Sequence, residues 1–429
     1  MQELFGLAIA NLLINVLRPN PESLQPIMVA AWQQAKIFDV PTTPDPIVEK
    51  IVDDYLQNIT ALGFSLDRQG VWIQSDWAYL GQHQSNLPLS AASLTKIATS
   101  IAALETWETD HRFETRIYTV GSLKNGVLTG DLVIQGNGDP LFVWEEAITL
   151  GNYLNKLEIR KVIGNLIIVD NFSMNFSFNP QTSGELLKVG LDKSRWRRIV
   201  EQKYQNFLPN TPRPQVTIMG EVQVQSNLPE GSQLLILHQS LTLAELLKQM
   251  NLYSNNAMAE SLAQSVGGAK IVAQKAARAA NVPFEEIQLI NGSGLGLENR
   301  ISPQASVAML IGIQKKLAGN LMNVTDIFPM AGRDTTGTVK WRNLPDGVAI
   351  KTGTLAQVSA LAGVISTKER GQVWFSIINH GYNIDRFRVE QDQLLQRLAD
   401  HWQLTNVSST QQTQPYLGDP QRNKLKAKS

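Results

Sequence analysis

The spacing of hydrophobic residues predicts helices in some stretches of this chain and strands in others. From Ser93 onward, apolar residues recur at Leu94, Ile97, Ile101 and Leu104, which places them on one face of a helix. We therefore expect a helix that begins at Ser93.

Upstream of this helix the texture changes from helical to strand-like. Residues 20–60 look helical, whereas residues 70–80 carry Trp72, Trp77 and Tyr79 among polar residues. Aromatic residues interspersed with polar ones are typical of half-buried strands. A first strand region is therefore expected around residues 70–80.

Downstream of the helix, the chain between about residues 113 and 228 is dominated by short β-like runs. Residues 116–120, 132–134 and 166–169 are such runs, and Gly and Asn punctuate the sequence between them. This texture predicts an inserted, mainly β domain over residues 116–229.

Helical texture resumes at Thr242, where Glu245 can reach back to the Thr242 amide in a capping box. A second helix is expected from about Asn256. The remaining predicted elements are strands over residues 348–352, 358–365 and 373–378 and a closing helix over residues 386–402. The tail from Ser408 is polar, ends in lysines and is expected to be disordered.

These elements divide the chain into four parts. Residues 1–60 are an N-terminal helical extension or anchor, residues 61–115 with 230–405 form the main α+β domain, residues 116–229 are the insert, and residues 406–429 are the polar tail. A length of 429 residues fits such a division better than a single domain.

Composition narrows the classes of function. Apolar residues make up 43% of the chain and charged residues 18%, an ordinary balance for a globular protein. Basic and acidic residues are equal at 38 each, which gives no reason to expect a nucleic acid partner. The chain has no cysteine, which excludes thiol nucleophiles, disulfides and thiolate metal sites, and its five histidines form no zinc-binding HExxH motif. The sequence gives no sign of a metal or an organic cofactor.

The first residues fit more than one role. Residues 4–17 are apolar apart from Asn11 and Asn15, too short for a spanning helix of about 20 residues. A secretory signal would need a positive start and a small-residue cleavage site, and neither is evident. An export or surface-anchoring segment and an amphipathic helix packed on the protein are both left open.

The first chemical motif is Ser93-Leu94-Thr95-Lys96. Three residues along a helix, Lys96 lies on the same face as Ser93. A serine hydroxyl is a poor nucleophile unless a base removes its proton, and a lysine kept neutral by desolvation can do so. The N–H groups at a helix start favour developing negative charge. An isolated Ser-x-x-Lys is nevertheless more often an ordinary helix start with a capping serine.

Two further motifs follow in the chain. Ser254-Asn255-Asn256 lies between two predicted helices, where a hydroxyl can relay a proton and an amide can hold a substrate backbone. Lys351-Thr352-Gly353-Thr354 ends a predicted strand, whose edge can align a peptide by backbone hydrogen bonds. Each motif alone is compatible with a plain turn or strand end. Ser-x-x-Lys, Ser-x-Asn and Lys-Thr-Gly in this order and context are typical of penicillin-recognising serine enzymes.

On these residues the chain resembles the D-alanyl-D-alanine carboxypeptidase/endopeptidase family of low-molecular-mass class C penicillin-binding proteins. The likeness covers roughly residues 65–170 and 240–400 and extends beyond the three motifs. The other segments that resemble the family are residues 104–105, 112–115, 130–132, 136–140, 292–295, 301–303 and 362–363.

The resemblance implies an α+β fold of the penicillin-binding-protein/β-lactamase-like transpeptidase type, in which helices flank a five-stranded antiparallel sheet. It also implies the role of each site residue. Ser93 would be acylated, Lys96 would be its base, Ser254 would shuttle the proton, Asn256 would bind the substrate amide and Lys351 would support Ser254. The remaining implied groups are the carboxylate-binding Thr352 and Thr354, with Gly353 between them, and the oxyanion-binding amides of Ser93 and Thr354.

Three departures from the family pattern stand out. The insert looks shorter than usual, Asn291 stands where aspartate is expected before Gly292, and the first 60 residues lack a clear export signal. The first bears on substrate preference and the last on localisation.

The leading hypothesis is therefore a serine-type D-alanyl-D-alanine carboxypeptidase, with endopeptidase activity left open. Its partners would be peptidoglycan peptides and, as covalent inhibitors, β-lactams, and it would act in the periplasm or elsewhere outside the cytoplasm, with membrane-surface association through the N-terminus left open. One alternative is a β-lactamase-like hydrolase with the same motifs, for which no water-activating glutamate can be placed. The other is a non-catalytic wall-binding scaffold, against which the intact motifs argue.

Overall fold

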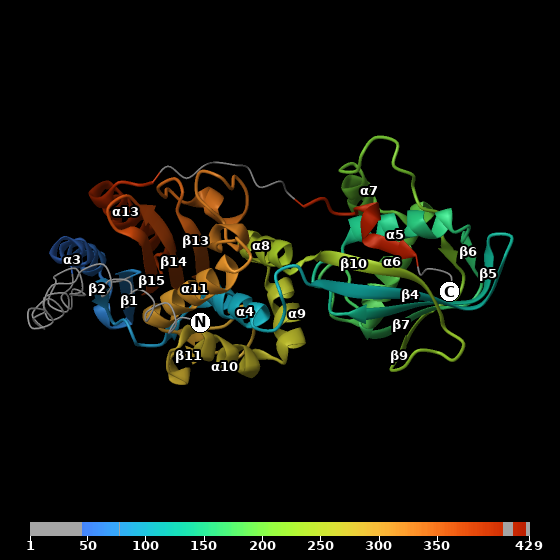
Figure 1. Cartoon of the computed structure of the whole chain (residues 1–429), viewed down its shortest axis with the longest axis horizontal. Helices are drawn as coiled ribbons and strands as arrows, with labels where there is room; N and C mark the ends of the chain where they lie inside the picture. Colours follow the sequence, from blue (N-terminus) through green and yellow to red (C-terminus); the bar gives the residue numbers. More distant parts are fainter. Residues whose placement is uncertain (1–44, 77, 406–414, 426–429) are drawn as a thin grey trace, which may run out of the picture.

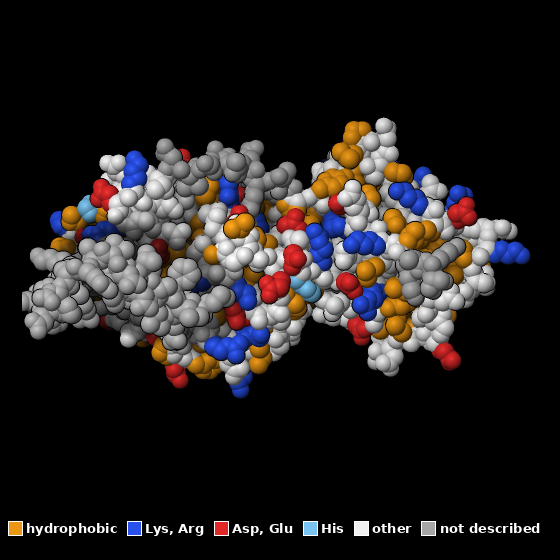
Figure 2. Space-filling model, in the orientation of Figure 1, with side chains coloured by type: hydrophobic (Ala, Val, Ile, Leu, Met, Phe, Trp, Pro, Cys, Tyr) orange, Lys and Arg blue, Asp and Glu red, His pale blue; other side chains and the backbone are white. Residues whose placement is uncertain are grey.

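The computed structural model describes residues 45–76, 78–405 and 415–425. They form two bodies that lie side by side along the long axis of the molecule (Figure 1). The space-filling view shows the surface narrowing between the bodies, with side chains of both charge signs around the narrow part (Figure 2).

The first body is built on a five-stranded sheet in which every neighbouring pair is antiparallel. Its strands, in spatial order, are β13 (Ala349–Leu355), β14 (Val358–Thr367), β15 (Gly371–His380), β1 (Gln69–Ser75) and β2 (Tyr79–His83). Beside it lies a small sheet of β3 (Leu89–Ser90), β11 (Ile287–Gln288) and β12 (Arg300–Ile301). The α+β fold class and the five-stranded antiparallel sheet are confirmed.

Helices cover both faces of the five-stranded sheet. One face packs against α3 (Pro46–Ala61) and α13 (Ile384–Trp402). The other faces α4 (Thr95–Leu104), α10 (Ala269–Ala280) and α11 (Pro303–Ala318), with α8 (Leu243–Tyr253), α9 (Asn256–Val266) and α12 (Val324–Ile327) beside them. Because both faces are covered, nearly every residue of β14 is buried, which explains its apolar run over residues 360–365. None of the helices in the described residues is both long and apolar enough to cross a membrane.

The boundary expected at residue 60 differs from the structure. Helix α3 is part of the first body, because Val48, Val52 and Ile59 are buried against the sheet and α13. The helical pattern was recognised, but an amphipathic helix at a chain end does not reveal by itself what its apolar face contacts. The anchor or leader considered for the first residues lies outside the described residues.

The second body is the insert, which contains more helix than its β-like texture suggested. Its sheet mixes antiparallel pairs, such as β4 with β5, and parallel pairs, such as β5 with β7. The strands are β4 (Arg112–Lys124), β5 (Val127–Asn137), β6 (Lys161–Val162), β7 (Leu166–Asn171), β8 (Thr217–Ile218), β9 (Val222–Gln225) and β10 (Gln233–Thr242). Its helices are α5 (Trp144–Lys156), α6 (Pro180–Leu191) and α7 (Arg198–Tyr204).

These helices cover one apolar face of the insert sheet, where Leu166 and Ile168 pack with the buried residues of α5 and α6. Residues Leu166, Ile167, Ile168 and Val169 of β7 are all buried. Parallel strands also need a crossover connection, and helices are the usual one. The helical period within residues 144–156 was hidden by the stronger signal of the surrounding strands.

The C-terminal segment corrects the expectation of a disordered tail. Residues 423–425 form strand β16, which pairs with β10 at the edge of the insert sheet, after a 3-10 turn over residues 420–422. The buried Arg422 donates from Nη2 to Glu146 Oε1 at 2.6 Å, and Asn423 Oδ1 lies 3.0 Å from His238 Nδ1. Disorder is therefore wrong for residues 415–425, because Arg422 and Asn423 have side-chain partners far away in the sequence.

Candidate active site

Ser93 lies where a 3-10 turn (η4, Ala92–Leu94) leads into α4. The preceding Ala92 has φ +45, in the left-handed region, so the chain turns sharply just before the nucleophile candidate. The Ser93 side chain is half-buried. The helix predicted to begin at Ser93 begins at Thr95, directly after the 3-10 turn that contains Ser93.

Lys96, the second residue of α4, is fully buried, and three oxygen atoms surround its amine. Its Nζ lies 3.1 Å from Ser93 Oγ, 2.7 Å from Asn256 Oδ1 and 2.7 Å from the Ser293 carbonyl oxygen. Burial lowers the pKa of Lys96 from 10.5 to about 7, against the opposing effect of the Glu260 charge. A large fraction of the lysine is therefore neutral near pH 7.

The three oxygens around a neutral Lys96 have distinct functions. A neutral amine has two N–H groups and one lone pair. The Ser293 carbonyl and the Asn256 amide oxygen are acceptors only, so they take the two N–H groups. The lone pair is left for the hydroxyl of Ser93, the only one of the three oxygens that carries a proton.

Ser254 and Asn256 are positioned by the turn between α8 and α9. Ser254 ends α8 in the left-handed conformation, with φ +52, and Asn256 is the first residue of α9. Ser254 Oγ accepts a hydrogen bond of 3.0 Å from Lys351 Nζ. The second motif therefore contacts both other motifs, through Asn256 to Lys96 and through Ser254 to Lys351.

Lys351 lies on β13, the strand at the edge of the five-stranded sheet. Its side chain is fully buried, and burial together with the charge of Lys96 holds the pKa of Lys351 well below 10.5. Its Nζ also donates to the Thr352 carbonyl oxygen at 2.7 Å. Two buried lysines thus share one site, and a charge on Lys96 disfavours a proton on Lys351.

Gly353 allows β13 to pack closely against the turn that carries Ser93, here called the nucleophile turn. A Cβ atom at this position would lie 2.8 Å from the Ala91 carbonyl oxygen and 3.1 Å from the Ser93 backbone nitrogen. On the alternate positions of the strand, Thr352 is buried and Thr354 is exposed, and Thr354 Oγ1 accepts from Arg388 Nη2 at 3.1 Å. The structure therefore places the Lys-Thr-Gly-Thr edge next to Ser93, as the sequence predicted.

Two parts of this site were not found from the sequence. Ser293 contributes its main-chain carbonyl, and Glu260 accepts hydrogen bonds from the backbone amides of Gly292 and Ser293. The segment around Gly292 was recognised only as a family signature and a turn. The one available signal was the position of Glu260, four residues after Asn256 and hence on the same face of its helix.

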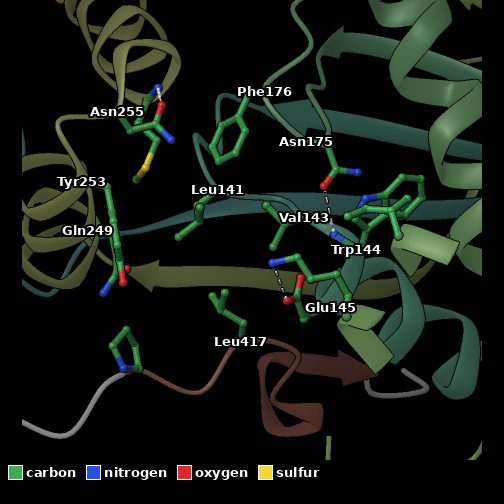
Figure 3. A pocket seen from close by; sticks show the side chains of 14 residues that line it. Leu141, Val143, Trp144, Glu145, Asn175, Phe176, Gln249, Tyr253, Asn255 and Leu417 are labelled. Atoms are coloured by element: carbon green, nitrogen blue, oxygen red, sulfur yellow. Dashed lines mark hydrogen bonds and ion pairs between the residues drawn. The ribbon is translucent and has the colours of Figure 1, made fainter. Parts of the chain in front are cut away.

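A cavity of about 470 Å³ lies next to the turn that carries Ser254. Figure 3 shows Gln249, Tyr253 and Asn255 on one side of it, Leu141 and Val143 of the insert on another, and Leu417 of the C-terminal segment below. Three distant stretches of the chain build its wall, so no local pattern could reveal it. The docked C-terminal segment is part of that wall.

The geometry agrees with the comparison against known families. The model of the D-Ala-D-Ala carboxypeptidase 3 (S13) family matches residues 49–177 and 193–401. The chain belongs to this family. The resemblance inferred from the motifs is thereby confirmed, and with it the assignment to serine-type peptidases.

The individual relatives and structural neighbours share only a low sequence identity with this chain. The D-alanyl-D-alanine carboxypeptidase DacB of Haemophilus influenzae is 24% identical over 395 residues, covering 68% of this chain and 81% of the relative. The predatory peptidoglycan endopeptidase Bd3459 of Bdellovibrio bacteriovorus has a similar structure, with a TM-score of 0.70 at 19% identity over 83% of this chain and 98% of the neighbour. Penicillin-binding protein 4 of Haemophilus influenzae gives a TM-score of 0.59 at 19% identity over 78% and 96%. At these identities the two structures support the fold.

Proposed function

We propose that this S13 family member is a serine D-alanyl-D-alanine carboxypeptidase that hydrolyses peptidoglycan peptides through an acyl-enzyme on Ser93. The observation that carries the proposal is the arrangement around Lys96. Its Nζ lies within hydrogen-bond distance of two pure acceptors and of Ser93 Oγ. Once the amine is neutral, the two acceptors take its N–H groups and its lone pair is left for the Ser93 hydroxyl. A lysine held in this way is a general base for serine.

In the proposed first step, Ser93 Oγ attacks the carbonyl carbon of the scissile bond while Lys96 takes the hydroxyl proton. The negative charge that develops on the carbonyl oxygen is stabilised by the backbone N–H groups of Ser93 and Thr354, which Gly353 allows to lie close together. The C–N bond then breaks, and the departing amine receives through the Ser254 hydroxyl the proton that Lys96 took, which leaves Lys96 neutral again. The product is an ester between Ser93 and the penultimate D-alanine.

In the second step, water replaces the departed amine and attacks the ester. Lys96 accepts a proton from the water and returns it to Ser93 Oγ as the ester C–O bond breaks, so the Ser93 hydroxyl re-forms and the carboxylic acid leaves. Lys351 supports the Ser254 hydroxyl throughout, because its Nζ donates to Ser254 Oγ. Asn256 would hold the substrate amide, and Thr352 and Thr354 would bind its terminal carboxylate.

The same chemistry applies to cross-linked peptides, whose scissile bond also follows a D-alanine. We therefore propose endopeptidase activity alongside carboxypeptidase activity, and β-lactams as covalent inhibitors. Among the structural neighbours, Bd3459 is a peptidoglycan endopeptidase with a penicillin G-acylated form, and penicillin-binding protein 4 forms a complex with a β-lactam. Since peptidoglycan lies outside the cytoplasmic membrane, we propose extracytoplasmic action, in the periplasm where one exists. Membrane association through the N-terminus stays a prediction from the sequence.

Intact-mass analysis after penicillin treatment tests the proposal. We expect one adduct on the wild type and none on Ser93→Ala, with slow release, together with D-alanine release from a D-Ala-D-Ala peptide by the wild type alone. Ser90→Ala, which changes a nearby serine outside the cluster, is the control and should retain the adduct. An adduct on Ser93→Ala would contradict the proposed nucleophile. Rapid turnover of penicillin would instead support the β-lactamase alternative, and no adduct on folded wild type would support the scaffold alternative.

A further inference from the structure

The loop over residues 292–294 determines where one of the three oxygens around Lys96 lies. The Ser293 carbonyl accepts from Lys96 Nζ at 2.7 Å, so a shift of this loop would release one N–H of the amine. The loop belongs to neither α4 nor α9, and its position must be maintained by other contacts. What holds the loop therefore also controls the orientation of the Lys96 lone pair.

A single carboxylate binds both backbone amides of this loop. Glu260 Oε2 accepts from the Gly292 N–H at 3.1 Å, and Glu260 Oε1 accepts from the Ser293 N–H at 3.0 Å. The two oxygens thus serve adjacent amides of the same segment. A carboxylate that receives two adjacent N–H groups in this way anchors the backbone of both residues, from which the Ser293 carbonyl extends toward Lys96.

The loop has little freedom in other directions. Thr99 Oγ1 donates to the Gly292 carbonyl at 2.7 Å. A Cβ on Gly292 would lie 2.4 Å from Ala263 Cβ, and one on Gly294 would lie 1.8 Å from the Ala92 carbonyl oxygen. The glycines let the loop fit tightly between α4 and α9, and Glu260 supplies its charged attachment.

We propose that Glu260 is a positioning residue for the catalytic base: its carboxylate holds the loop whose Ser293 carbonyl lies against Lys96, and its charge acts on the Lys96 amine. The inference rests on the proposed function, because it assumes that Lys96 acts as the base. The charge of Glu260 opposes the lowering of the Lys96 pKa by burial. Glu260 thereby keeps the amine basic enough to accept the serine proton.

Helix α9 connects this effect to the second motif. Asn256 and Glu260 are four residues apart on α9 and lie on the same face. Asn256 accepts directly from Lys96, and Glu260 acts through Ser293. One turn of one helix therefore supplies or positions both acceptors that direct the lone pair toward Ser93.

The test is the pH dependence of acylation by a fluorescent penicillin. Acylation needs neutral Lys96, so its second-order rate constant should rise with pH through the pKa of Lys96. In Glu260→Gln the charge is lost and one amide faces an NH₂ group. We expect the midpoint of the acid limb to move down by roughly half to one pH unit and the plateau to fall by about tenfold or more. Glu260→Asp keeps the charge, but its shorter side chain no longer reaches the backbone amides of the loop. The plateau of the acylation rate should therefore fall while the midpoint of the acid limb stays at the wild-type pH.

Glu245→Gln is the matched control, since Glu245 also accepts a backbone amide but caps α8 away from Lys96. It should behave like the wild type. A wild-type midpoint in folded Glu260→Gln, judged by circular dichroism and thermal unfolding, would overturn the inference even if the plateau fell. If Glu260→Gln does not fold, an unchanged plateau in Glu260→Asp would overturn it. Failure of the wild type itself to form an adduct would refute the proposed function, which is a distinguishable result.

Discussion

The buried amine of Lys96 should make the stability of this protein depend on pH in a predictable way. Burial lowers the Lys96 pKa from 10.5 to about 7. Between these values the unfolded chain holds a proton that the folded chain has released, so stability rises with pH by about 1.4 kcal/mol per unit. At pH 7 the cost of this release is about 4 kcal/mol relative to pH above 10.5.

Lys96→Met removes this dependence while keeping a side chain of similar length. The substitution relieves the cost of burying the amine, but it leaves Asn256 Oδ1 and the Ser293 carbonyl without their donor, at about 1–3 kcal/mol each. These contributions oppose each other at neutral pH, so the decisive quantity is the slope. From pH 7 to pH 9, the wild type should gain about 2 kcal/mol of unfolding free energy relative to Lys96→Met.

Chemical denaturation at several pH values between 7 and 9 measures this difference. Lys351 is present in both proteins, and the larger cause of its lowered pKa is burial, which Lys96→Met leaves in place, so most of its own contribution cancels. Lys50→Met, in which the replaced side chain is 74% exposed, is the control. The difference in unfolding free energy between the wild type and Lys50→Met should stay constant over this pH range. A constant difference between wild type and Lys96→Met over this range would refute the reasoning, because it would mean that Lys96 titrates alike in the folded and unfolded chains.

Two further substitutions test the geometry of the site and of the tail. In Gly353→Ala, the added methyl group would meet the Ala91 carbonyl at 2.8 Å and push β13 from the nucleophile turn, so the rate of penicillin adduct formation should fall about tenfold or more; an unchanged rate would contradict this close approach. In Arg422→Ala, Glu146 keeps a buried carboxylate without its cation, which should destabilise the insert by about 3 kcal/mol and speed hydrogen exchange in β10 while the Ser93 adduct still forms. Unaltered exchange in β10 would show that the C-terminal segment does not stabilise the sheet.

The sequence predicted the parts of this site whose chemistry is local. Three residues of helix suffice to place Lys96 beside Ser93, and the apolar run before Lys351 suffices to place it on a strand. Spacing alone could not show that these segments meet, because Lys96 and Asn256 are 160 positions apart. Their convergence was expected from the resemblance to a family, and the structure brings them together.

Other features depend on contacts that leave no local pattern. The Ser293 carbonyl is a main-chain atom, which any residue type would provide, so no residue identity marks it. Arg422 and Glu146 lie 276 positions apart, and a polar tail looks the same in sequence whether or not such a partner exists. Long-range polar pairs of this kind can order a polar segment whose composition alone would suggest disorder.

The site contains two buried lysines, and oxygen atoms in fixed positions accept hydrogen bonds from both of their amines. Lys96 and Lys351 are both fully buried, and a proton on Lys96 disfavours one on Lys351. Because protonation of one lysine disfavours protonation of the other, a proton taken up by Lys96 is readily given away again. This suits the proposed reaction, which takes a proton from Ser93 and delivers one through Ser254. Moving it in the required direction depends on where each lone pair points. In the proposed reaction, the Ser293 carbonyl, Asn256 and the carboxylate of Glu260 therefore determine the direction in which the amine can accept a proton.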